Sequence, residues 1–104
     1  MHFVLLGTHT ADVCPVSNSK TRDLMLQTAP QIPDIAERNG VTMVAGPYVN
    51  DEHLIVTVVE ADQAEKVHQF VSDARLNQWN TIHVVPSLTV QEAMKEIQES
   101  TSLF

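Results

Sequence analysis

Four short β-prone runs, separated by helical patterns, limit this chain to a small set of folds. The runs span residues 2–8, 41–49, 53–60 and 81–85, and their β-branched and aliphatic side chains favour strands. A helix is expected over about 19–38, and a second helix between the last two runs. The predicted order is therefore strand, helix, strand, strand, helix, strand, followed by a terminal helix.

Two prolines predict which strands lie at the edges of the sheet. Pro47 lies within the second run, and Pro86 is expected to end the fourth. Because proline donates no backbone hydrogen bond, both strands are expected at edges, with a bulge near Gly46. The element order is the ferredoxin-like split βαβ pattern, an α+β fold whose four-stranded antiparallel sheet has the strand order 4-1-3-2.

Capping and breaking residues predict where the helices begin and divide. Prolines in the first helix are expected to kink or split it near Thr28. Asp62 with Glu65 and Thr89 with Glu92 match capping boxes, which predict the starts of the second and the terminal helix.

The two central strands carry apolar side chains on both faces. Residues 2–8 and 53–60 are apolar at odd and even positions alike, and a sheet buried on both faces needs cover on each. The two main helices cover one face. A second copy of the chain is expected to cover the other, with some help from the terminal helix, which predicts a homodimer packed through its sheets.

These features resemble the dimeric α/β-barrel superfamily over nearly the whole chain. Within it, residues 39–73 are similar to the YCII-like group, through a strand ending in Ala45-Gly46-Pro47, a hairpin strand and an acidic-capped helix. The YCII-like resemblance implies a His–Asp pair with its aspartate at Asp73. The matching position on the first helix is Ala29, and no histidine occurs from residue 10 to 52.

A second branch of that superfamily, the monooxygenase-like barrels, is resembled through a late Trp and His. Here those residues are Trp79 and His83. The asparagine that this branch carries on its first strand is absent, and Thr8 or His9 would have to replace it. These resemblances imply a YCII-like or monooxygenase-like enzyme as alternative functions.

Length and charge narrow the classes of partner. The 104 residues fit one domain, 1–104. A net charge of −7 without a basic run disfavours nucleic-acid and membrane-surface binding. A single cysteine excludes an internal disulfide. The start of the chain is apolar for only a few residues and has no basic lead-in, so we expect no signal peptide and a cytoplasmic location. No glycine-rich phosphate loop indicates a nucleotide cofactor.

Antiparallel pairing brings three histidines toward one end of the predicted sheet. His9 ends the first strand, His53 begins the third, and His83 lies near the start of the fourth, beside the loop that carries Cys14. Imidazole and thiolate together suit zinc, copper or iron, so this rim is a candidate transition-metal site. The alternative is a set of solvated rim residues, since strand alternation can point His53 and His83 to opposite faces.

Cys14 is also a candidate reactive thiol. It lies a few residues before a predicted helix start, where backbone donors and the helix dipole favour a thiolate, and His9 is a candidate base. This predicts redox or sulfur chemistry on a small molecule. The alternatives are a buried structural cysteine among Val13 and Val16, and a non-catalytic ligand-binding, metal-binding or assembly protein.

Three further residues are candidates for the site. Asp73 is a candidate general base in a cleft, and also a candidate solvated helix position. Trp79 and Tyr48, the only Trp and Tyr, are candidate ligand contacts. A lone Trp more commonly packs in a core.

Overall fold

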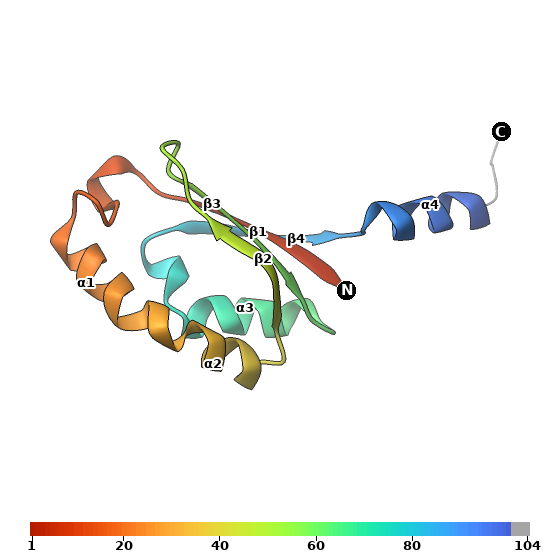
Figure 1. The fold of residues 1–104 in the computed structure, drawn as a ribbon, viewed down its shortest axis with the longest axis horizontal. Coiled ribbons are helices and arrows are strands. Elements are labelled where there is room, and N and C mark those ends of the chain that lie inside the picture. Colours follow the sequence, from red (N-terminus) through yellow and green to blue (C-terminus); the bar gives the residue numbers. More distant parts are fainter. Residues whose placement is uncertain (101–104) are drawn as a thin grey trace.

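The computed structural model describes residues 1–100, and residues 101–104 lie outside the described part. Within it, one four-stranded antiparallel sheet has the order β2-β3-β1-β4 (Figure 1). The strands are β1 (His2–Thr8), β2 (Thr42–Tyr48), β3 (Leu54–Glu60) and β4 (Thr81–Ser87). β1 and β3 are central and the two proline-containing strands are at the edges, as the sequence predicts. The α+β class is confirmed, and the sheet is compatible with a ferredoxin-like fold.

The predicted helices are present, and the first is split where its prolines lie. The helices are α1 (Ser19–Thr28), α2 (Ile32–Arg38), α3 (Ala64–Asp73) and α4 (Val90–Glu99). A 3₁₀ turn, η2 (Ala29–Gln31), separates α1 from α2, because each proline removes a backbone donor. Two more 3₁₀ turns, η1 (Ala11–Val13) and η3 (Leu76–Gln78), follow β1 and α3.

The hydrophobic core lies between the inner face of the sheet and the helices α2 and α3. Alternate residues of β1 point into it, while their neighbours face the other way. The most deeply buried side chains come from both layers: Phe3, Val59, Val67 and Phe70. This packing determines which face of the sheet lies against the helices.

Two boundaries differ from the sequence prediction. Asp62 does not cap α3: the N-cap is Gln63, which makes no side-chain cap bond, and Asp62 instead pairs with Lys66 at 3.3 Å. β4 continues through Pro86 to Ser87. Proline lacks a backbone N–H, and an edge strand tolerates this because one of its sides has no partner strand to receive that hydrogen bond. The capping box of Thr89 and Glu92 at the start of α4 is confirmed.

The predicted irregularity of β2 is also confirmed. The pairing of β2 with β3 shifts register on either side of Ala45. Gly46 follows with φ +82°, in the left-handed region that favours glycine. A Cβ at this position would lie 2.5 Å from the carbonyl oxygen of Val56, so this edge accepts only glycine without a rearrangement.

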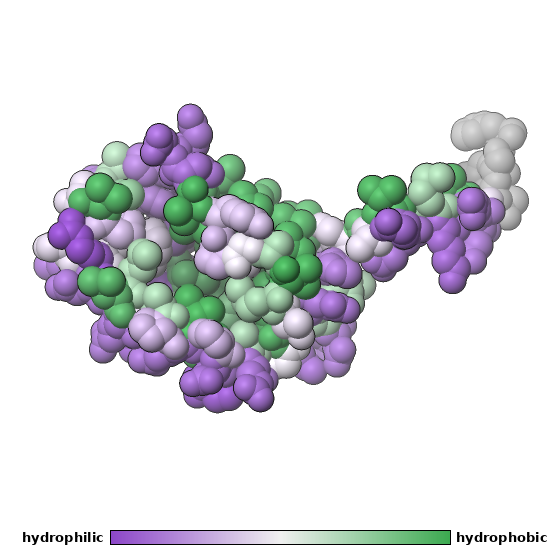
Figure 2. Space-filling view, in the orientation of Figure 1, coloured by the Kyte–Doolittle hydropathy of each residue, from purple (hydrophilic) through white to green (hydrophobic). Residues whose placement is uncertain are grey.

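The outer face of the sheet has no cover from this chain within residues 1–100. α4 extends away from the sheet (Figure 1) and buries none of its residues, so the expectation that it covers part of this face is wrong for a single chain. Hydrophobic side chains lie along one side of α4 (Figure 2). Among the described residues, no helix has both the length and the apolar character to cross a membrane.

Candidate functional site

His9 owes its position to the register of the sheet. The register pairs Thr8 with the first residue of β3 on one side and the first residue of β4 on the other. His9 is the first residue after β1, and it lies between His53 and Asn80. The backbone N–H of His9 donates to the carbonyl of His53 at 3.3 Å. Three segments far apart in the sequence therefore meet where the ladder ends.

Asn80 holds the ring of His9. His9 Nδ1 lies 2.9 Å from Asn80 Oδ1, and Asn80 Nδ2 donates to the Leu76 carbonyl at 3.0 Å. Because the amide nitrogen of Asn80 donates to a carbonyl, its amide oxygen faces the ring and accepts a hydrogen bond from Nδ1–H. A neutral His9 then keeps a lone pair on Nε2. That atom is buried, and no hydrogen-bond partner among residues 1–100 reaches it.

His53 is held by the turn that joins β2 to β3. Its backbone lies in the left-handed region, with φ 57°, a conformation that costs a residue with a Cβ about 1–2 kcal/mol. Asn50 stabilises the turn: its side-chain oxygen accepts from the backbone N–H groups of Glu52 and Leu54, and its carbonyl accepts from His53. The turn aims the imidazole toward His9.

Cys14 lies in a loop with many backbone anchors. Its carbonyl accepts from the N–H groups of Ser17 and Asn18 at 3.0 and 2.8 Å. Arg22, reaching back from α1, donates to the carbonyls of the next two residues, Pro15 and Val16. The side chain of Cys14 is therefore presented from a fixed backbone, and it is partly buried.

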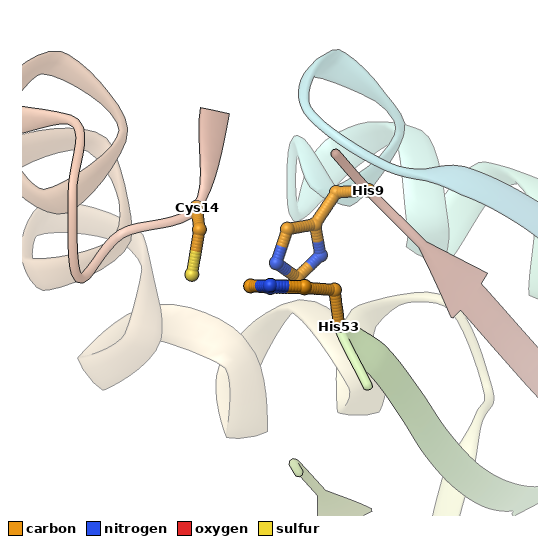
Figure 3. A group of neighbouring side chains, drawn as sticks. All are labelled: His9, Cys14 and His53. Carbon is orange, nitrogen blue, oxygen red and sulfur yellow. The ribbon is translucent and has the colours of Figure 1, made fainter. Parts of the chain in front are cut away.

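Together these three residues form one group, here called the His9–Cys14–His53 site (Figure 3). One ligand atom from each lies within 4.8 Å of the others. The two imidazoles meet edge to face with ring centroids 5.2 Å apart, and Trp79 packs against His9 at 5.0 Å. In Figure 3 the sulfur of Cys14 lies beside the two rings.

The site forms one end of an apolar cleft of about 640 Å³. The cleft lies between the inner face of the sheet and the segment that runs from α1 to α2. Its lining is mostly hydrophobic, with contributions from every layer: Leu5, Met25, Ile32, Met43, Phe70 and Leu76. An apolar space that ends in a few convergent polar groups is the usual form of a small-molecule site.

The structure assembles part of the predicted residue set. His9, Cys14, His53 and Trp79 all line the cleft. His83 does not join them: it pairs in register with Leu6, which alternation places on the outer face. Tyr48 is 62% exposed on the edge strand β2 and does not line the cleft.

Asp73 lies at the end of α3, away from the cleft lining. Asn39 and Gln69 donate side-chain hydrogen bonds to its carboxylate at 3.1 and 2.7 Å, and these bonds lower its pKa. A carboxylate that amides hold in its charged form is a weaker base. The His–Asp pair implied by the YCII-like resemblance is therefore not assembled, and Ala29 lines the cleft where that histidine would be.

Asn80 lies at the site although its residue type gives no sign of this in the sequence. It is 7% exposed, one of the few buried polar residues, and it orients His9. The register of β1 against β4 is the signal that points to it, since the residue before β4 must face the residue after β1.

No family model, curated protein or solved structure matches the chain.

Proposed function

We propose that the protein binds a small, largely apolar molecule in the cleft and presents the His9–Cys14–His53 site to one end of that molecule. The observation that carries the proposal is the apolar cleft of about 640 Å³ with two imidazoles and a thiol at its end. Such a volume is within the usual range for small-molecule sites. The hydrophobic lining supplies affinity, and the polar end supplies orientation and chemistry.

Trp79 gives a direct test, because it is the only tryptophan and lines the cleft. The neutral fluorophore N-phenyl-1-naphthylamine should bind and quench Trp79 by energy transfer. Ala29→Phe narrows the cleft and should weaken binding by tenfold or more, whereas Ala93→Phe, on α4, should leave it unchanged. Saturable binding that both variants retain equally would place the fluorophore elsewhere and contradict the proposal.

The chemistry proposed for this end is redox or sulfur chemistry at Cys14 assisted by His9. The lone pair on His9 Nε2 supports it, because a nearby imidazole can take the thiol proton and leave a nucleophilic thiolate. A non-catalytic ligand-binding role and a monooxygenase-like role are the alternatives.

Alkylation of Cys14, the only cysteine, tests this chemistry without a known substrate. Iodoacetamide should react faster with the protein than with a Cys-containing peptide, and His9→Gln should slow the reaction. The bound fluorophore should protect the thiol. A rate that neither His9→Gln nor the fluorophore changes would leave Cys14 as a structural cysteine, in which case Cys14→Ala costs stability rather than reactivity.

The second part of the proposal is a homodimer of ferredoxin-like subunits, in which the outer faces of the two sheets pack together. The outer face of the sheet carries Val4, Leu6, Val58 and Val85, which register places side by side. On α4, Val90, Met94 and Ile97 are 73%, 51% and 66% exposed. A large exposed apolar surface is commonly an interface, and a second copy offers the same two surfaces in return.

Light scattering during size exclusion tests the dimer. The wild-type chain should elute with the mass of two chains at high micromolar concentration. Val85→Lys should yield the monomer, because it places a charge in the proposed interface, while Val16→Lys, at a loop position that is 84% exposed, should not. A monomeric wild-type protein would refute this part and leave the cleft proposal standing.

A further inference from the structure

We infer that His9, Cys14 and His53 bind a zinc ion, with the fourth position of the ion open to the apolar cleft. The inference deepens the cleft-binding part of the proposed function and rests on it for the identity of the fourth ligand alone. In the zinc-bound protein, His9 Nε2 is a ligand of the ion and not a base for Cys14. Two imidazoles and one thiolate are a donor set that zinc accepts. Three protein ligands with one open position is also the arrangement of zinc sites that act on substrates, whereas purely structural sites have four protein ligands.

The spacing of the donors is close to what zinc requires. Zn–N and Zn–S bonds of about 2.0–2.3 Å in a tetrahedron place neighbouring donor atoms about 3.3–3.8 Å apart. The donors of the site lie within 4.8 Å of one another. Zinc binding would therefore need these donors to close by no more than about 1.5 Å.

His9 is already prepared as a ligand. Zinc-bound histidines usually donate their second ring N–H to an oxygen, which fixes the tautomer and raises the basicity of the ligating nitrogen. His9 makes such a bond from Nδ1 to Asn80 Oδ1 at 2.9 Å. Its Nε2 is buried without a hydrogen-bond partner among residues 1–100, a costly state for a polar atom. A bound cation would use this lone pair.

The other two ligands come from backbones that the chain holds in place. His53 keeps a left-handed conformation within its Asn50-stabilised turn. Cys14 lies in the loop that Arg22 fastens to α1. When zinc binds, the Sγ–H bond of Cys14 breaks, an Sγ–Zn bond forms and the proton passes to the buffer, with no change of oxidation state. The ion then faces the cleft, where a water or a donor atom of the bound molecule completes its coordination.

Titration of the tag-free protein with Zn²⁺ by calorimetry tests the inference. One ion should bind per chain with a dissociation constant below micromolar. The heat should vary with the ionisation enthalpy of the buffer, because the thiol proton is released. Co²⁺ should give a thiolate charge-transfer band and the visible bands of a tetrahedral site. Cys14→Ser should abolish the charge-transfer band and weaken Zn²⁺ binding by at least a hundredfold.

Two matched histidine variants identify the ligands. His53→Gln should weaken Zn²⁺ binding at least a hundredfold, whereas His83→Gln, on the outer face, should leave it unchanged. Asn80→Ala should weaken it about 10–100-fold. Binding no tighter than micromolar, or full affinity in Cys14→Ser, would overturn the inference. The fluorophore titration on metal-free protein is independent, so cleft binding can succeed or fail whatever the zinc result.

Discussion

Replacing Asn80 by alanine should destabilise the fold and release the ring of His9. The change removes the Asn80 Oδ1 acceptor of His9 Nδ1 and the hydrogen bond from Asn80 Nδ2 to Leu76. Each bond contributes about 0.5–1.5 kcal/mol, and a buried N–H left without an acceptor costs about 1–3 kcal/mol. The Leu76 carbonyl still accepts a hydrogen bond from the backbone N–H of residue 80, so losing the bond from the Asn80 side chain costs little stability at that carbonyl. We expect a total loss of about 2–3 kcal/mol.

Urea denaturation followed by circular dichroism, with a chelator present, measures this loss without a contribution from bound metal. A loss of that size lowers the midpoint by about 0.7–3 M, for a slope of about 1–3 kcal/mol per molar urea. Asn77→Ala is the matched control, because Asn77 is exposed in the adjacent η3 turn, and its midpoint should stay near that of the wild type. If Asn80→Ala loses less than about 0.5 kcal/mol, within the usual range of surface substitutions, Asn80 does not hold His9 in solution.

Three other predictions follow from the backbone and the caps. His53→Gly should be more stable than His53→Ala by about 1 kcal/mol, because glycine adopts the left-handed conformation of residue 53 without cost; equal urea midpoints would contradict this. Gly46→Ala should lose about 2 kcal/mol or more in the same assay, since the new methyl group meets the Val56 carbonyl, and a wild-type midpoint would refute that reasoning. Hydrogen bonds from the Thr89 backbone and side chain lower the pKa of Glu92. The stabilisation from the capping box is therefore complete above the ordinary glutamate pKa and is lost as the pH falls through the lowered pKa of Glu92. An NMR titration of Glu92 should show a lowered pKa, and Thr89→Ala should raise it.

The sequence predicts the fold better than it predicts the site. Strand order follows from prolines and from apolar patterning, because both depend on local backbone chemistry that the sequence displays. Pro47 and Pro86 correctly indicate the two edge strands. The end of β4 is less well predicted, because a proline removes a hydrogen bond between strands only where its backbone nitrogen faces a partner strand, and β4 continues past Pro86. Asp62 shows the same limit: its motif fits a cap, but the side chain pairs with Lys66 instead.

For the site, the sequence predicts which residue types meet but not which way they point. His9 and His53 meet because the register continues one step past the ladder. His83 is equally near in sequence terms, yet alternation places it on the opposite face. Asn80 is invisible to a search for nucleophiles, bases and metal ligands, because an amide has no chemistry of its own there. Its importance comes from a contact across 71 positions of the chain.

The continuation of the ladder into the site ties insertions and deletions to function. One residue added to or lost from β1, β3 or β4 would move a site residue out of line with its two neighbours. The loop between His9 and α1 is not bound by that register. Homologues of this chain should therefore keep the count of residues from the start of β1 to His9 constant, and a change of length between His9 and α1 should spare the hydrogen-bonded segment that holds Cys14.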